Sequence, residues 1–403
     1  MPATRSRAAV VAVIGLNQIF AWGSSYYLPA VLAGPIAADT GWAPGWVLGG
    51  LSLGLLVAGL VSPWVGREIE RLGGRPVLVA SALLLATGLI LLGLAHSLMT
   101  YEMGWLVLGL GMGSGLYDPA FAALGRTYGE EARGPITAVT LYAGFASTIC
   151  WPLTALMAAQ LGWRATCFVY AAVNLLLLLP LYVFALPREE RRAAPPARVR
   201  SVSAANPTSV AERLAFVLTA LTFTLAVVTM TVVAVHLLTI LKASGLDAGA
   251  AVALGAMIGP SQVAARVIEI LFGRRYHPIW TMLGATLLVA LGIGVLLADL
   301  RIAWLGLILY GAGNGLRSVA RGTLPLALFG PHGYAALMGR LALPVLFAQA
   351  ASPSVGQALL AVAGPRGTLL VLGGVTIANL AVAACLLPLV ARRGAMAGAP
   401  SQG

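Results

Sequence analysis

Four arginines lie inside long apolar stretches of the sequence: Arg266, Arg317, Arg321 and Arg340. A charged side chain at the centre of a membrane helix costs about 2.5–3.5 kcal/mol on insertion scales. Arg317 and Arg321 are four residues apart, so a helix places them on one face, with Asn314 one turn away. Their stretch contains no carboxylate. Because the planar guanidinium group binds carboxylates and phosphates, the pair indicates a site for an organic anion.

The other two arginines each have two explanations. Arg340 lies near the end of its stretch, where its side chain can reach the membrane surface. Arg266 comes three residues before Glu269, and the two can form an ion pair within one helix. Alternatively, Arg266 contacts the substrate. The buried acids Glu269 and Asp118 are candidates for proton coupling, and Asp118 is equally suited to be the counter-charge of an arginine.

The composition identifies the elements that must position these residues. The chain has 403 residues, of which 59% are hydrophobic and 9% charged, and its mean hydropathy is +0.91. A soluble domain has about 25% charged residues. This excludes a soluble enzyme, a disordered chain and a secreted disulfide scaffold, and it predicts a membrane protein. The net charge of +12 lies in gaps between apolar runs rather than in one patch, so we expect a lipid bilayer and no nucleic acid as the partner.

Runs of about 20 apolar residues predict membrane-spanning helices. The sequence contains twelve such runs, at 8–34, 45–64, 76–95, 102–125, 136–159, 165–186, 214–241, 249–272, 279–297, 303–328, 337–361 and 368–390. The long polar segment 187–213 separates six of them from the other six. We therefore expect an all-α membrane protein with twelve transmembrane helices in two six-helix halves, 1–186 and 214–403, joined by a cytoplasmic linker.

The basic residues predict the orientation. Of the 25 lysine and arginine residues, 17 fall on one side of the predicted spans, four on the other and four within them. Since basic residues favour the cytoplasmic side, both termini are expected in the cytoplasm. The expected location is the inner membrane of a bacterium.

The two halves resemble each other at an offset of 200 residues. Gly111–Leu116 matches Gly311–Leu316, and Gly73 and Arg75 match Gly273 and Arg275. Many transporters are built from such repeats and hold the substrate between them. The same offset places Tyr117 opposite Arg317, so Tyr117 is a further candidate for substrate contact.

The loop after the second predicted span carries a family resemblance. It reads Gly66-Arg67-Glu68-Ile69-Glu70-Arg71-Leu72-Gly73-Gly74-Arg75, and it resembles the G-x-x-x-D-R-x-G-R loop of the major facilitator superfamily, with Glu70 in place of Asp. The resemblance implies a cytoplasmic latch of charged residues that breaks when the halves rock. Its members would be Gly66, Arg67, Glu70, Arg71, Gly73 and Arg75. The alternative is a plain basic loop.

The same resemblance implies that the first, fourth, seventh and tenth helices line the cavity. Asn17 and Tyr26 of the first span then become candidates for substrate binding, beside the alternative that the tyrosines and Trp22 of this span belong to an interfacial belt.

Within the superfamily, the chain looks most like the monocarboxylate and oxalate–formate exchanger branch. The supporting segments are Ala21-Trp22-Gly23 through Pro29, Gly162-Trp163-Arg164 and Ala265-Arg266. This likeness implies that Arg266 contacts a carboxylate. The branch has an aspartate one turn before that arginine, whereas this chain has Gln262, which directs attention to Asp118 or Glu269 for proton coupling.

We therefore expect a secondary transporter for a small organic anion, proton-coupled or exchanging, with Arg317, Arg321, Arg266, Asn314, Tyr117, Asn17 and Tyr26 at the substrate. We expect it to act as a monomer. No catalytic residue, cofactor or metal site is expected, because the histidines are scattered and the cysteines lack metal-ligand spacing. Two alternatives stay open: efflux of drugs or other amphiphilic compounds, and a membrane receptor or assembly factor that transports nothing.

Overall fold

The structure of this chain, a computed structural model, describes residues 6–188 and 209–391. Most of the predicted linker, residues 189–208, lies outside the described residues, and so do both chain ends. Within the described ranges the chain is helical and has no strands, as predicted, and most residues of each predicted span are helical. The chain divides into two compact units, one of Met1–Arg200 with Pro331–Ala351 and one of Ser201–Gly330 with Ser352–Gly403.

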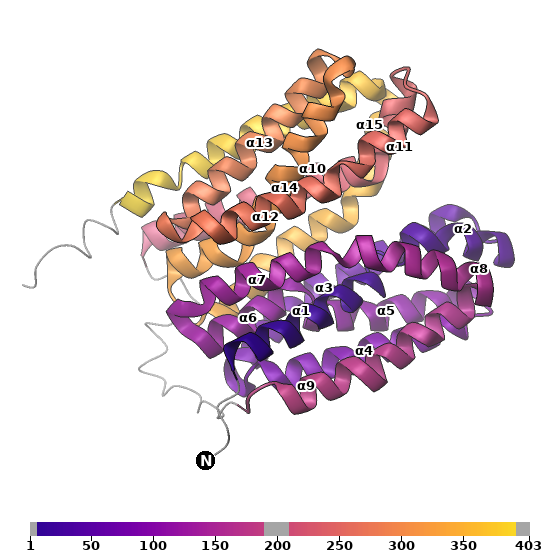
Figure 1. Cartoon of the computed structure of the whole chain (residues 1–403), viewed down its shortest axis with the longest axis horizontal. Coiled ribbons are helices and arrows are strands. Elements are labelled where there is room, and N and C mark those ends of the chain that lie inside the picture. The colour runs from indigo at the N-terminus through magenta and orange to yellow at the C-terminus, as the bar shows by residue number, and fades with distance from the viewer. Residues whose placement is uncertain (1–5, 189–208, 392–403) are drawn as a thin grey trace, which may run out of the picture. The chain divides into compact units, whose positions relative to one another are not determined.

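The first unit packs its helices around a core that contains the buried aromatic residues Tyr101, Trp105 and Tyr170. Pairs of glycines let the helices approach closely: a Cβ on Gly109 would lie 2.5 Å from the carbonyl oxygen of Gly54. The elements (Figure 1) are α1 (Arg7–Gly23), α2 (Pro29–Thr40), α3 (Pro44–Leu72), α4 (Gly74–Gly93), α5 (Leu98–Gly115), α6 (Tyr117–Tyr128), the 3₁₀ turn Gly129–Ala132, α7 (Arg133–Gly144), α8 (Ala146–Val173), the π turn Asn174–Leu178 and α9 (Leu179–Ala185).

The second unit has its own core, which includes Val232, Ile293, Leu307 and Leu369. Its elements are α10 (Val210–Ala243), α11 (Ala248–Ala256), α12 (Ile258–Phe272), the 3₁₀ turn Gly273–Arg275, α13 (Pro278–Ala298), the 3₁₀ turn Leu300–Ile302, α14 (Ala303–Phe329) and α15 (Tyr334–Ala384). Helix α15 bends at Gly364, whose φ is 67°. Its first part, up to Ala351, packs with the first unit, and the rest belongs to the second.

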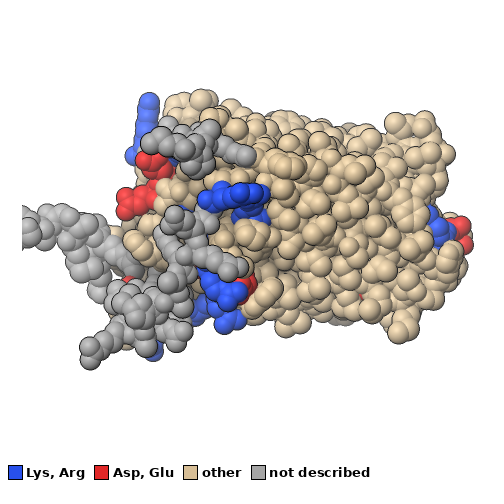
Figure 2. Space-filling model, turned by 90° about the horizontal axis from the view of Figure 1, so that it is seen from below, with Lys and Arg blue, Asp and Glu red and all other residues tan. Residues whose placement is uncertain are grey.

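The helices suit a membrane. Seven helical stretches within the described residues are long and apolar enough to cross a bilayer, and two of them, Leu98–Ala185 and Tyr334–Ala391, are long enough for more than one crossing. Figure 2 shows charged side chains gathered toward the ends of the face drawn, with a broad uncharged surface between them. This pattern is that of a multi-pass membrane protein.

One predicted span is broken. The run 102–125 forms two helices, because Leu116, between α5 and α6, has an extended ψ of −156°. Pro119 lacks an N–H and cannot bond to the carbonyl of Gly115 four residues before it. The Gln18 side chain of α1 donates to that carbonyl instead, at 2.6 Å. The break leaves Tyr117 and Asp118 in the first turn of α6.

Helix α3 and the first part of α15 cross at two glycines. A Cβ on Gly339 would lie 2.2 Å from the carbonyl oxygen of Ser62, and one on Gly66 would lie 2.4 Å from that of Ala335. The hydroxyl of Ser62 donates to the carbonyl of Gly339 at 2.9 Å. The crossing is therefore a backbone-to-backbone contact that only glycine permits.

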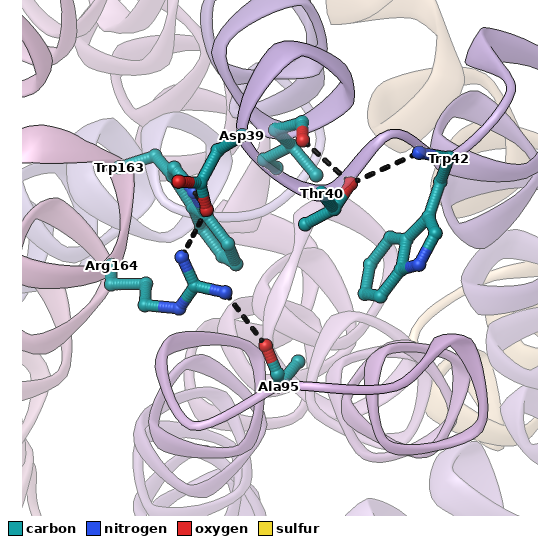
Figure 3. Close-up of polar contacts among 7 residues, drawn as sticks. Asp39, Thr40, Trp42, Ala95, Trp163 and Arg164 are labelled. Atoms are coloured by element: carbon teal, nitrogen blue, oxygen red, sulfur yellow. Dashed lines mark hydrogen bonds and ion pairs between the residues drawn. The ribbon is translucent and has the colours of Figure 1, made fainter.

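A polar clamp joins three segments of the first unit (Figure 3). Asp39, near the end of α2, pairs with Arg164 of α8 and accepts a hydrogen bond from the Trp163 indole at 3.0 Å. Arg164 also donates to the carbonyl of Ala95, after α4, at 3.1 Å and lies over the Trp163 ring. The two hydrogen bonds, with Arg164 as the leading cause, hold the pKa of the Asp39 carboxyl below its usual value.

Candidate functional site

Arg266 lies between α12 and α14 of the second unit with only 5% of its surface exposed. Its Nε donates to the Ser318 hydroxyl at 2.9 Å, and its Nη2 donates to the Gln262 side chain at 3.3 Å. Among the described residues, its Nη1 is buried and has no hydrogen-bond partner. Arg266 is therefore a buried cation held by two neutral groups.

Close packing explains why Arg266 reaches Ser318. The glycines of α14 face the backbone of α12: a Cβ on Gly311 would lie 2.8 Å from the oxygen of Ile258, and one on Gly315 would lie 2.4 Å from that of Gln262. These glycines are the ones that revealed the sequence repeat. In this half they bring α12 within hydrogen-bond reach of α14.

The predicted alternative of an ion pair between Arg266 and Glu269 is wrong. Glu269 is buried and accepts from the Tyr276 hydroxyl at 2.7 Å and from the Thr281 hydroxyl at 2.9 Å. Arg266 makes no ion pair with it in the described chain, because their side chains extend to different neighbours. Glu269 thus accepts hydrogen bonds from two hydroxyls and stays a candidate for proton coupling.

Arg317 lies beside Asn314, as the spacing predicts. Its Nε donates to the Asn314 oxygen at 3.3 Å, and its Nη2 contacts the sulfur of Met230 on α10. The two side chains line a small pocket inside the second unit, together with Ala226, Thr229, Met282, Ala285, Thr286, Val289, Thr376 and Asn379. Arg321, one turn further along α14, is buried with 8% of its surface exposed. The second unit therefore holds three arginines on two adjacent helices.

The first unit brings Tyr26 and Tyr117 together around Trp22. The centre of the Trp22 ring lies 5.3 Å from that of Tyr26 and 5.0 Å from that of Tyr117. The indole of Trp22 donates to Gln18 at 3.1 Å, which fixes its orientation. With three further rings these form a group that we call the aromatic cluster: Trp22, Tyr26, Tyr27, Tyr117, Phe121 and Trp151.

Asn17 lies apart from the aromatic cluster. It is 1% exposed, and its Nδ2 donates to the carbonyl of Val13 in its own helix at 2.9 Å. Asp118 is 9% exposed in the first turn of α6. Its predicted roles in proton coupling or charge compensation stay predictions.

The predicted latch lies where α3 meets α4. Arg71 pairs with Glu68 at 2.8 Å, and Arg67 donates to the carbonyl of Pro63 at 3.2 Å. Arg75 donates to the carbonyl of Val183 in α9 at 2.5 Å, and Gly73, with φ of 88°, makes the turn between the two helices. Gly66 lies at the α3–α15 crossing, and Glu70 is part of the last turns of α3. Arg75 thus ties α4 to α9, whereas these contacts of Arg67 and Arg71 stay within α3.

Sequence reasoning missed two features of these sites. Ser318 was not predicted as the partner of Arg266, although a serine on a glycine-rich helix can accept a hydrogen bond from a buried arginine. Trp151 was not predicted to join the aromatic residues of the first span. Its ring packs on Tyr27 with centres 6.0 Å apart, and no spacing in the sequence connects residues so far apart.

The family model described as Major Facilitator Superfamily matches residues 14–275. No curated protein sequence is similar enough to count as a relative.

Among solved structures, the human organic anion transporter MFSD10 (TETRAN) is similar with a TM-score of 0.71 and 17% identity, over 93% of this chain and 99% of that one. The E. coli fucose:proton symporter FucP has a TM-score of 0.71 and 12% identity, over 93% and 97% of the two chains. The proton:xylose symporter XylE has a TM-score of 0.69 and 14% identity, over 95% of each chain. At these identities the likeness establishes the fold.

Proposed function

Because this chain belongs to the Major Facilitator Superfamily, a family of membrane transporters and not of enzymes, we propose that its substrate is a small organic anion. The anion is carboxylate-like and crosses the membrane by alternating access, in symport with protons or by exchange. The proposed location is a bacterial inner membrane, with twelve crossings and both termini in the cytoplasm. One structural neighbour, the human protein MFSD10, is described as an organic anion transporter.

The main support for an anionic substrate is the buried Nη1 group of Arg266. A buried guanidinium without a counter-charge is costly, and it is retained where a function requires it. Ser318 accepts a hydrogen bond from its Nε and Gln262 accepts one from its Nη2. Nη1 is left as a buried donor. A carboxylate supplies both the missing acceptor and the missing negative charge.

Further residues fit the same substrate. Arg321 and Arg317 add positive charge on α14, and Asn314 orients Arg317 through the bond to its Nε. Tyr117 and Tyr26 are proposed to contact the remainder of the anion, and Asn17 to support α1. Glu269 and Asp118 are the proposed proton carriers.

The test is transport of radiolabelled carboxylates into proteoliposomes by the wild type and by Arg266→Gln. A hydrogen bond to a charged group contributes about 1.5–3 kcal/mol, so the variant is expected to bind the anion about 10- to 150-fold more weakly. Arg266→Lys keeps the positive charge but lacks the planar guanidinium group. It is therefore expected to recover only part of the affinity.

Arg301→Gln is the matched control, because Arg301 is an exposed arginine outside the predicted spans. It is expected to transport as the wild type does. Unchanged transport by Arg266→Gln would refute the assignment of the site.

The second candidate function is efflux of amphiphilic compounds, which the aromatic cluster favours because its rings lie on helices of the membrane region. That function predicts drug resistance in cells that express the protein and no response to Arg266→Gln.

A further inference from the structure

His236 is a buried histidine of α10 that the proposed function does not use. It is 7% exposed, and it lies seven residues before Ala243, the last residue of the helix, which is about 10 Å along the helix axis. An ionisable residue within a membrane-spanning helix marks a functional site by default, and proton relays are among its uses. Histidine is also the side chain that changes charge most readily between about pH 5 and pH 8. His236 is therefore a candidate proton site in addition to Glu269 and Asp118.

Helix α15 fixes which nitrogen of His236 can take a proton. Nε2 lies 2.9 Å from the carbonyl oxygen of Pro353, in the part of α15 that belongs to the second unit. A carbonyl oxygen only accepts, so Nε2 carries the hydrogen and Nδ1 is the basic nitrogen. Gly356 packs against the ring: a Cβ there would lie 2.7 Å from Cδ2 and 2.9 Å from Nε2. The imidazole is thus held in one orientation and one tautomer, and it can gain a proton on Nδ1 while it keeps its hydrogen bond.

Arg317 lies near enough for its charge to act on His236. Its Nη2 contacts the sulfur of Met230, which lies six residues before His236 on α10, about 9 Å along the helix. Two positive charges about 10–15 Å apart repel each other, and at an effective dielectric constant of about 20 this lowers the proton affinity about 5- to 15-fold. An anion bound at Arg317 cancels the repulsion. Binding of the anion therefore favours protonation of His236, and protonation raises the affinity for the anion by the same factor.

The other charged residues near this end of α10 have less influence. Helix α10 packs with α11, α14 and α15. Three of the charged groups are exposed, so water and ions screen them: they are Lys242 of α10, Asp247, which caps α11, and Arg366 of α15. Arg321 lies one turn beyond Arg317 on α14 and is buried. Of these groups, Arg317 and Arg321 are the ones whose charge the proposed anion neutralises.

We infer that His236 is the residue that couples a proton to the anion in the second unit. This inference rests on the proposed function, in which Arg317 adds positive charge at the anion. One proton from water binds the lone pair of Nδ1 and gives an imidazolium, while the hydrogen on Nε2 stays in its bond to Pro353 and no other bond changes. Symport of one such proton with a singly charged anion transfers no net charge across the membrane.

The first experiment observes the proton site without any substrate. The chain contains four histidines, so protein labelled with nitrogen-15 histidine gives an NMR spectrum of few signals, in which His236→Gln identifies those of His236. We expect hydrogen on Nε2 alone at about pH 8.5 and on both nitrogens at about pH 5.5. Gly356→Ala is expected to displace the ring and mix the two tautomers. Gly374→Ala is the matched control in the same helix, because a Cβ there meets nothing within 4 Å.

The second experiment measures how the affinity for an anion depends on pH. Equilibrium binding of radiolabelled lactate and benzoate is compared at about pH 5.5 and about pH 8.5, a range in which carboxylates of this kind stay largely ionised. The wild type is expected to bind about 5- to 15-fold more tightly at the lower pH. His236→Gln keeps an N–H for the Pro353 carbonyl but cannot take a proton. It is therefore expected to bind at both pH values as the wild type does at the higher one. His96→Gln, which changes an exposed histidine between α4 and α5, is expected to keep the wild-type pH dependence.

The outcomes separate the two proposals. If Nδ1 of His236 gains no hydrogen between the two pH values, the proton site is refuted while anion transport stands. If His236→Gln keeps the pH dependence of the wild type, another residue couples the proton, and the inference fails in the same way. An equal loss of affinity at both pH values, with a lower melting temperature, assigns His236 a structural role and also refutes the inference. If the wild type binds and transports no carboxylate at either pH, the proposed function itself is overturned, and the coupling falls with it.

Discussion

Replacing Gly339 by alanine adds one methyl group where α15 crosses α3. The new Cβ would lie 2.2 Å from the carbonyl oxygen of Ser62 and 3.2 Å from the Cα of Gly66. A carbon–oxygen contact normally measures about 3.3 Å, so the helices must separate by about 1 Å. Both obstacles are backbone atoms, which cannot turn aside as a flexible side chain can.

The energetic effect follows from that displacement. Overpacking a tight contact costs about 1–3 kcal/mol. Separation also lengthens the 2.9 Å bond from the Ser62 hydroxyl to the Gly339 carbonyl, which adds to the loss. A change of about 1–3 kcal/mol shifts an equilibrium about 5- to 150-fold, so the detached state of the first part of α15 becomes that much more populated.

The assay is maleimide labelling of a cysteine at position 335. Ala335 is fully buried at the crossing, and Cys385 is the exposed native cysteine to be replaced by serine first. The labelling rate of such a site follows the population of the opened state. We expect the rate to rise about 5- to 150-fold in Gly339→Ala.

Gly374→Ala provides the control in the same helix, because a Cβ there meets nothing within 4 Å. It is expected to leave the labelling rate unchanged. If Gly339→Ala labels no faster than Gly374→Ala, the crossing is not a tight glycine contact, and the reasoning fails.

Two further predictions concern the first unit. Asp39→Asn is expected to lower the melting temperature slightly at pH 7: because the pKa of Asp39 is depressed, its stabilising effect is present above its usual value of 3.8 and is lost as the pH falls through the lower pKa. Thermal unfolding from pH 7 to below pH 3.8 checks this, and a difference from wild type that does not shrink as the pH falls below 3.8 would contradict it. Gln18→Leu is expected to destabilise the protein by about 1–3 kcal/mol, because the buried carbonyl of Gly115 loses its donor. Denaturant unfolding measures the loss, and Thr87→Val, which removes an exposed hydroxyl bonded within its own helix, is expected to cost far less.

The sequence predicted the helical class, because apolar runs of bilayer length in a chain with so few charged residues favour membrane-spanning helices. It did not predict the break at Leu116, although Pro119 was visible. The repeat suggested that the fourth and tenth spans are alike, but the second half has Val319 at the corresponding position, and α14 continues unbroken. The similarity between the repeats therefore predicted two unbroken helices, although Pro119 is present in only one of them.

The candidate site was predictable in part. Spacing on one helix brought Asn314 and Arg317 together, and the hydrogen bond between them confirms it. Spacing failed for Arg266, because Ser318 of another helix competes with the neighbour at i+3 for the guanidinium. Helical periodicity gives the direction of a side chain, whereas the choice between partners depends on how closely two helices pack.

The division of α15 between the two units has a mechanical consequence. Gly339 is 13 residues before Ser352, where the part belonging to the second unit begins, which is about 20 Å along a helix. A rotation of about 10° at Ser352 would therefore move Gly339 by about 3 Å, more than the α3–α15 crossing tolerates. The helix acts as a lever arm. A small tilt at Ser352 is enough to break the contact that Gly339 makes with α3.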